Sequence, residues 1–415
     1  MTYAIRLGRS VLATAAIVAG CGEAGAQNRF SADVSTGASV ATNPYLQDGQ
    51  GGSSESVFVE VAPVYVIQGP TTVSRLSGQL RVEPFLRRYS TDTLAAVNFD
   101  RTSRVSDRFV YRSGINFVTS RASALNALFL GPNGGAFGGP IGGTTGGTVG
   151  IDPTTLPVSI DPSYLGRPQR TTSASINAGV SYITGPRGSL DVDLSAQAQR
   201  FDDATLGEYN FATQRIQYGS RRSDRTTLTA GVTFGQSNYL GTQLGDGYTI
   251  SPILGINTQL SPTIKASVGG GVSYARFRRL QGDTGTITAF ALQAQICKTH
   301  SQGRYCLNAD RSVQPTALGS LRTLTGVFAS YDNRLNENDR LSLSASYNVS
   351  EESAESVGIP TSSFIGARAE LSHRISRRLD VFGSAAYADI LQAGITRRPS
   401  IQGRVGIRFR VGSLE

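Results

Sequence analysis

Apolar and polar residues alternate with a period of two along much of the chain. In the stretch RLSLSASYNVS, Leu341, Leu343 and Tyr347 fall on one side, and serine and asparagine residues fall on the other. Successive side chains of a β-strand point to opposite faces, so this stretch predicts a strand with one apolar and one polar face. The same alternation recurs at 176–182, 190–198, 264–274 and 401–411. The sequence therefore predicts an all-β protein.

Two kinds of connection join the alternating stretches. Tight turns are predicted at TGPRGS, LSPT, LNENDR and ISRRLD, whereas long polar segments lie between other stretches, the longest being 121–170. A soluble β-sandwich also has alternating strands, so alternation alone leaves the architecture open. Short turns that alternate with long loops are typical of a transmembrane β-barrel, in which the turns face the periplasm. The connections therefore favour an antiparallel transmembrane β-barrel.

The expected barrel has about 16 to 18 strands, and 18 is preferred because it places every tight turn at one end. Removing one weakly patterned hairpin from this assignment would leave about 16 strands, a number equally typical of such barrels. The predicted strands are 29–41, 56–68, 71–88, 92–104, 108–120, 171–184, 189–201, 208–219, 225–236, 248–260, 264–279, 285–297, 305–315, 320–334, 340–350, 363–376, 379–390 and 400–412.

The first residues of the chain have the pattern of an export signal. A basic start is followed by a short apolar run, and AGA at 24–26 provides an A-x-A cleavage site. The apolar run is too short to span a bilayer as a helix. The alternative is a lipoprotein signal, because VAGC would make a lipidated Cys21 the first residue. We expect cleavage after Ala26, which gives a signal peptide at 1–26, a barrel domain at 27–415 and a location in the bacterial outer membrane.

Positive charge is carried almost entirely by arginine. The chain has a formal net charge of +9, and its lysines are Lys265 and Lys298. An arginine that faces lipid near mid-membrane costs about 2 to 4 kcal/mol, so arginines within strands are expected to face the lumen. They would either attract anions in the lumen or pair with Glu83, Glu370, Asp191, Asp193 and Asp380 in a structural network. The candidate pore-lining residues are Arg75, Arg81, Arg112, Arg368, Arg374, Arg404, Arg408 and Arg410.

Enzymatic and metal-binding functions are disfavoured by the scarcity of histidine. The chain contains His300 and His373, which leaves no evident Ser-His-acid set and no His-based metal site. The segment CKTHSQGRYC predicts a disulfide between Cys297 and Cys306, because an exported chain enters an oxidising compartment. We therefore expect a non-enzymatic protein with no cofactor, no metal and no nucleic-acid partner.

The longest loop, 121–170, is the third external connection in this assignment. It either folds into the lumen as a constriction or extends outside, and LNALFLG at 125–131 and Tyr164 are candidate anchors to the wall. The glycine-rich run at 131–150 is not a phosphate-binding loop, because it does not join a strand to a helix.

Four segments carry a family resemblance: AQNRFSADVSTGASVATNPY, SYDNRLNENDRLSLSASYNVS, CKTHSQGRYC and GRVGIRFRVG. With them the chain resembles the β-barrel porins encoded beside exopolysaccharide assembly genes in Gram-negative bacteria, including those that make gellan-like sphingans. This resemblance implies an outer-membrane channel that exports an acidic polysaccharide, with outer-membrane lipid, the polymer and periplasmic export components as partners. The alternatives are a general, weakly anion-selective diffusion porin and a plugged structural or adhesive barrel.

Overall fold

The computed structural model describes residues 27–47, 52–121, 169–203, 205–241, 246–278, 284–317, 320–351, 361–392 and 397–412. The predicted signal peptide at 1–26, with Cys21, and residues 122–168 of the long loop, with Tyr164, lie outside the described residues. No helix in the described part of the chain is long and apolar enough to cross a membrane.

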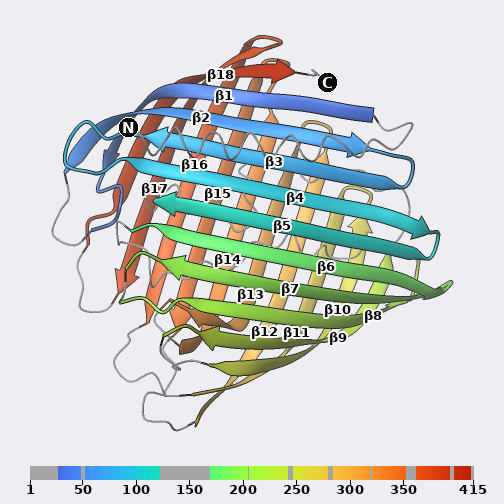
Figure 1. Ribbon diagram of the computed structural model, residues 1–415. Helices are drawn as coiled ribbons and strands as arrows, with labels where there is room; N and C mark the ends of the chain where they lie inside the picture. Colours follow the sequence, from blue (N-terminus) through green and yellow to red (C-terminus); the bar gives the residue numbers. More distant parts are fainter. Residues whose placement is uncertain are drawn as a thin grey trace.

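The described chain forms one 18-stranded antiparallel sheet that closes on itself. Each strand pairs with its neighbours in sequence, and the last strand pairs with the first, with Val34 opposite Phe409 and Ala38 opposite Val405. Figure 1 shows β18 beside β1, and front and back walls that cross because the strands of a barrel are tilted. The predicted fold and the preferred strand number are confirmed.

The strands are β1 (Gln27–Thr42), β2 (Ser53–Gln68), β3 (Thr72–Glu83), β4 (Asp92–Ser106), β5 (Phe109–Arg121), β6 (Thr171–Gly185), β7 (Gly188–Phe201), β8 (Tyr209–Arg221), β9 (Thr226–Tyr239), β10 (Gly247–Ser261), β11 (Ile264–Arg278), β12 (Thr284–His300), β13 (Gly303–Thr316), β14 (Ser320–Arg334), β15 (Asp339–Glu351), β16 (Ser362–Ser376), β17 (Leu379–Gln392) and β18 (Ser400–Gly412).

The expected strand at 71–88 is too long. β3 ends at Glu83, because Pro84 has no backbone N–H with which to continue the ladder. Beyond it, Phe85 makes an isolated bridge to Ser56 and packs against Tyr45 from the preceding loop. The segment after Pro84 therefore belongs to the loops rather than to the wall.

The two ends of the barrel differ in their connections. At one end, which we call the turn end, the links have at most four residues, as at 222–225 and 335–338. The other end, which we call the loop end, carries the longer links, up to 122–170, together with one short link at 317–319. At the turn end each hairpin is bonded to the next strand; for example, Arg221 N donates to Arg187 O (2.7 Å) and Arg410 N donates to Arg378 O (2.8 Å). These bonds tie the turns into a continuous rim.

Apolar side chains cover the outer face of the wall. Leu254, Val405 and Leu194 are 71%, 65% and 50% exposed, and each points away from the lumen. A surface of this kind is stable only against lipid, so the barrel spans a membrane. Exposed tyrosines and phenylalanines lie toward both strand ends, an arrangement typical of the aromatic girdles that flank the apolar band of a membrane barrel. They are Phe30, Tyr182, Tyr218, Tyr305 and Phe409 toward the turn end, and Phe117, Phe234, Tyr248, Tyr274, Phe290, Tyr347 and Tyr387 toward the loop end.

Two loops at the loop end are locked together around Tyr45. Its hydroxyl donates to the carbonyl oxygen of Ser90 (3.0 Å), and its ring packs against Phe85 and Tyr89. Burial, and secondarily the charge of Asp92, raise the pKa of Tyr45, so the hydroxyl keeps its proton and remains a donor. Asn43 adds a bond to the carbonyl oxygen of Arg398 (2.8 Å) from the β17–β18 connection. These contacts hold the loops that flank the β1–β18 closure.

Candidate functional site

All eight arginines predicted to line the pore lie on the lumen face of their strands. On β18, lipid-facing Ile401, Val405 and Ile407 are exposed and alternate with the arginines. The same alternation places the arginines of β3, β5 and β16 inside, because their neighbours Leu80, Ile115 and Leu371 face lipid. The parity of the strands was therefore sufficient to assign these side chains to one face.

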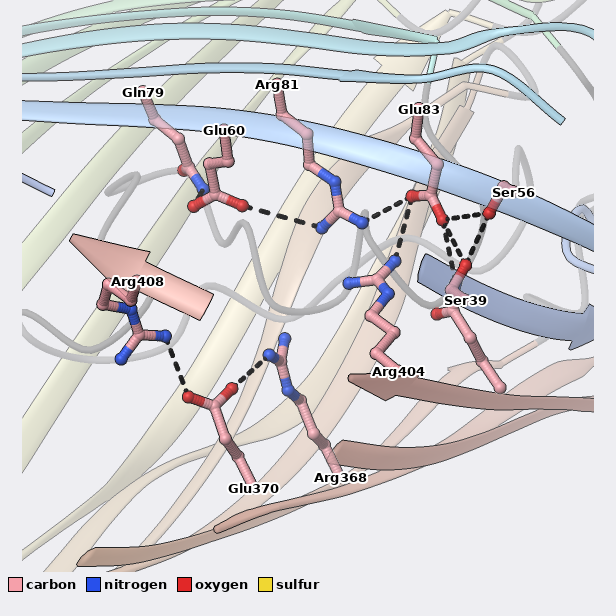
Figure 2. Close-up of polar contacts among 11 residues, drawn as sticks. Ser39, Ser56, Glu60, Gln79, Arg81, Glu83, Arg368, Glu370, Arg404 and Arg408 are labelled. Atoms are coloured by element: carbon pink, nitrogen blue, oxygen red, sulfur yellow. Dashed lines mark hydrogen bonds and ion pairs between the residues drawn. The ribbon is translucent and has the colours of Figure 1, made fainter. Parts of the chain in front are cut away.

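Glu83 is the centre of the larger polar cluster, which ties four consecutive strands across the barrel closure. Its carboxylate is fully buried and accepts from Arg81 Nη2 (2.5 Å) on the same strand and from Arg404 Nη2 (3.1 Å) on β18. Ser39 of β1 and Ser56 of β2 donate to its other oxygen at 2.6 and 2.8 Å (Figure 2). One carboxylate thus joins β18, β1, β2 and β3.

A second glutamate also forms ion pairs with two arginines. Glu370 of β16 accepts from Arg368 Nη2 (2.6 Å) and from Arg408 Nη2 (3.0 Å), which reaches it across β17 (Figure 2). Glu60 belongs to the first cluster: its Oε2 lies 3.8 Å from Arg81 Nη1, and its Oε1 accepts a hydrogen bond from Gln79 Nε2 (2.9 Å). The two clusters together form a continuous polar patch over β16, β17, β18, β1, β2 and β3, which we call the seam patch.

Aromatic rings hold the guanidinium groups of the seam patch in place. Arg81 and Arg404 lie over the ring of Phe58, at 5.2 and 5.7 Å from its centroid, and Arg408 lies 5.0 Å from the centroid of Phe382. Cation–π contacts of this kind are worth about 0.5 to 2 kcal/mol each.

Glycines on the lumen face make room for these two rings. A Cβ at Gly37 would overlap the carbonyl oxygen of Val405 and lie 2.9 Å from the ring of Phe58, and one at Gly406 would lie 2.7 Å from the carbonyl oxygen of Thr36 and 2.8 Å from the ring of Phe382. Larger side chains at either position would therefore clash both with the neighbouring backbone and with the ring on which an arginine stacks.

The remaining predicted arginines also lie near acids. Arg410 Nε bonds to Asp33 (3.1 Å) at the closure, and Arg374 lies 3.9 Å from Asp380. Arg112 Nη2 lies 3.3 Å from Asp193 Oδ1 and 3.8 Å from Asp191 Oδ1, and Arg75 stands opposite Asp100 in the β3–β4 register. All five carboxylates named as structural partners in the sequence are therefore in ion pairs. Asp33 and Glu60 were missed, although both follow from the same parity.

Exposure of the lumen face changes from one end of the barrel to the other. On β16, Phe364 near the loop end is fully buried, the side chain of Arg368 is 15% exposed and that of Arg374 near the turn end is 49% exposed. On β18, the side chains of Arg404, Arg408 and Arg410 rise through 6%, 26% and 37% in the same direction. We call the packed loop-end half of the lumen the neck and the solvated turn-end half the vestibule. The seam patch lies where one passes into the other.

The predicted disulfide is present on the lumen face in the vestibule half. It joins Cys297 of β12 to Cys306 of β13, which stand directly opposite each other with Cα atoms 4.2 Å apart. Arg304 Nε lies 3.0 Å from Cys306 Sγ. Among the described residues, no group of three or more His, Cys, Asp or Glu could hold a metal ion.

Comparison with known proteins gives a likeness of architecture. No family model matches the chain, and no curated protein is similar to it. Among solved structures, Pseudomonas aeruginosa OccK2 in complex with glucuronate has a TM-score of 0.45 at 10% identity and covers 94% of this chain and 99% of its own. A BenF-like porin from Pseudomonas fluorescens Pf-5 has a TM-score of 0.44 at 8% identity, covering 94% and 99%. OccAB3 from Acinetobacter baumannii has 0.42 at 8%, covering 93% and 100%. TM-scores below 0.5 support no conclusion about function. The function of this chain is therefore inferred from its own strand pairing and side chains.

Proposed function

We propose that this protein is a bacterial outer-membrane channel that favours small anionic solutes. One observation carries the proposal: in the seam patch, Glu83 and Glu370 each hold two arginines at the boundary between the vestibule and the neck. With Glu60 beside Arg81, the seam patch holds four arginines and three glutamates and therefore has an excess of one positive charge. A lumen wall with low-dielectric surroundings focuses the field of such charges on passing ions.

The arginines suit transient rather than tight binding. Each guanidinium has five N–H donors in a planar fork, a geometry that suits the carboxylate or phosphate of a passing solute. Because all four arginines are already paired and three of them also stack on a ring, a solute gains only part of the strength of a free arginine–carboxylate pair. Weak contacts of this kind allow solutes to pass, whereas a single tight site would retain them.

The outer-membrane location is supported by the shape of the barrel. Its short turns and long loops are segregated to opposite ends, and its exterior is apolar. Both features are typical of bacterial outer-membrane barrels. The predicted signal peptide and its cleavage after Ala26 would deliver the chain to the periplasm, where such barrels are assembled.

Conductance in planar bilayers under a KCl gradient tests the proposal. We expect the reversal potential of the wild type to show preference for Cl⁻, and the variant Arg368→Gln/Arg408→Gln to lose part of it, because the lumen loses two positive charges. Arg101→Gln/Arg276→Gln is the matched control. It removes two exposed arginines that lie on the outer face of their strands, and the channel should keep its preference for Cl⁻. Addition of glucuronate, the sugar acid of the OccK2 complex, should reduce the Cl⁻ current of the wild type. A cation-selective channel would overturn the proposal.

Burial of the neck favours a second candidate, a closed structural or adhesive barrel. Glu83, Phe364 and Ser400 on three strands are fully buried although all face the lumen. A barrel of this type would bind partners through its loops and would pass no current. Absence of conductance from correctly folded wild type, verified by heat-dependent mobility on an SDS gel, would replace the channel by this second candidate.

Export of an acidic exopolysaccharide stays a prediction from the resemblance of the sequence. The seam patch offers arginines that a uronate-bearing polymer could contact in succession. Deleting the gene and measuring surface polysaccharide tests this role. Unchanged polymer export would remove it and would leave the diffusion channel untouched.

A further inference from the structure

The end of the β13–β14 hairpin leaves the barrel wall. Pairing between β12 and β13 stops at Leu292 opposite Arg311, although β13 continues to Thr316 and β12 reaches back to Thr284. β13 and β14 remain paired with each other up to Thr316 opposite Ser320. We call residues 312–317 and 320–324 the strap.

The strap reaches strands that are far from it in the wall. The hydroxyl of Tyr239, the last residue of β9, donates to the carbonyl oxygen of Thr316 (2.9 Å) and accepts from its N–H (3.0 Å). Gly207 N, from the β7–β8 connection, donates to the carbonyl oxygen of Ala317 (2.6 Å). β9 is four strands from β13, which is about 19 Å along a wall with a strand spacing of about 4.8 Å. The strap must therefore leave the wall and pass over the lumen side of the intervening strands to make these contacts.

Apolar packing holds the strap against the inner wall. Val313 and Leu321 pack with Phe277 of β11 and Ile287 of β12, and all four are buried. β11 contacts β13 across β12, and it contacts β14 across β12 and β13. At the far side, Ala317 packs with Leu206 and with the aromatic residues Phe201, Tyr209 and Tyr239. The strap is thus packed along its length within the neck.

The sequence contains a reason for the departure from the wall. The close Cα approach of Cys297 and Cys306 marks a non-hydrogen-bonded pair of the β12–β13 ladder. Continuing that register, Pro315 would stand opposite Thr288 at a hydrogen-bonded position. Proline has no N–H to donate there, so extension of the ladder would leave a carbonyl group of β12 unsatisfied. Pro315 therefore favours a hairpin end that is free to turn inward.

Charged residues fix the base of the strap where it leaves the wall. Both terminal nitrogens of Arg311 bond to the carboxylate of Glu351 at the end of β15, at 2.5 and 2.7 Å, and one bonds to Thr325 at 2.7 Å. Arg322, which is fully buried, donates from Nε to the backbone carbonyl oxygen of Glu351 (3.0 Å). With its base and its tip both bonded, the strap has the contacts of a fixed element rather than of a loose loop.

We propose that the strap is a fixed crossbar of the neck that sets the upper size of the solutes that pass, with Tyr239 as the residue that positions it. This inference rests on the proposed channel function. Size selection would then be made by described strand residues of the β13–β14 hairpin, independently of the charge preference of the seam patch on the other side of the barrel.

Shortening the strap is the direct experiment. Residues 313–323 are replaced by Asn-Gly, which joins Ser312 to Leu324 through a two-residue hairpin turn and leaves the β12–β13 ladder intact. In planar bilayers we expect a rise in single-channel conductance and entry of larger polyethylene glycols. Replacing residues 335–338 by Asn-Gly shortens the next hairpin connection at the opposite end and should change neither quantity.

A point variant keeps the test informative if the shortened chain fails to fold. Tyr239→Phe retains the ring and removes the hydroxyl that bonds the tip, so we expect an unstable, larger conductance with normal heat-dependent mobility on an SDS gel. Tyr274→Phe, which alters a lipid-facing ring, is the matched control. If the shortened-strap variant and Tyr239→Phe both keep the conductance and polymer exclusion of the wild type, the crossbar is overturned and the channel function is not. A silent wild type would overturn the channel function, whereas conduction gained by shortening the strap would still support the crossbar.

Discussion

At the scale of single residues, the lumen wall is organised by carboxylates that each serve two arginines. Glu83 has no exposed surface and accepts hydrogen bonds from Arg81, Arg404, Ser39, Ser56 and Gln402. Buried charges are tolerated only when they are paired and hydrogen-bonded. Removing the central carboxylate would therefore leave two guanidinium groups close together without their shared counter-charge.

The variant Glu83→Ala should strongly destabilise the barrel. Breaking a buried ion pair by removing one partner costs about 3 to 5 kcal/mol, and here two arginines lose the same partner. The midpoint of urea unfolding in lipid vesicles measures the effect. Glu337→Ala, in an exposed turn, is the control and should unfold like the wild type. An unchanged midpoint for Glu83→Ala would show that the cluster contributes little to stability.

At the scale of the strands, neighbouring residues meet different solvents. In β7, Leu194 is 50% exposed on the lipid side, and Ser195 points into the lumen, where its hydroxyl lies 2.6 Å from that of Thr213. The period of two in the sequence was enough to predict this arrangement, because it is imposed by strand geometry. A strand can therefore be tested by placing the same charge at two adjacent positions.

Arginine should be tolerated at position 195 and rejected at position 194. Leu194→Arg places a charge in hydrocarbon near mid-strand and should lower the free energy of unfolding by about 2 to 4 kcal/mol. Ser195→Arg places the same side chain in the lumen and should have a much smaller effect. Unfolding by urea in vesicles compares the two variants. Equal destabilisation would contradict the assignment of the faces.

At the scale of the whole molecule, closure joins the two ends of the chain. β1 lies between β2 and β18, and ion pairs such as Arg410 with Asp33 accompany the backbone ladder on the lumen side. Without this pairing, two strand edges would face lipid with unsatisfied backbone groups, each at a cost of several kcal/mol. The surrounding lipid therefore favours closure of the barrel, in addition to the side-chain contacts between the first and last strands.

A cross-link between the first and last strands tests closure directly. The variant Val34→Cys/Phe409→Cys places two cysteines at directly opposed positions on the lipid-facing side, and we expect a disulfide on mild oxidation. Val34→Cys/Val405→Cys offsets them by four residues, because Val405 stands opposite Ala38, and should remain reduced. Mass spectrometry of proteolytic fragments identifies the link beside the native Cys297–Cys306 bond. Cross-linking in the offset variant alone would contradict the register.

The sequence by itself determined the strands, their faces and the preferred strand number, because alternation and turn chemistry act locally and leave a direct trace in the residues. It also placed the eight arginines on one side and named the Cys297–Cys306 disulfide, since both depend on parity and on short separation in the chain. It overextended β3 where Pro84 ends the ladder.

Only the tertiary structure decided which acid meets which arginine. The partners Glu83 and Arg404 are brought together by barrel closure over more than three hundred residues, and Glu370 reaches Arg408 across a strand. The strap was equally hidden, because Tyr239 and Thr316 lie far apart in the sequence and in the unrolled sheet. Contacts between distant strands on the lumen side depend on the curvature of the barrel wall and on where the hydrogen-bonded pairing of two strands stops. Neither can be read from a short stretch of sequence, apart from hints such as Pro315.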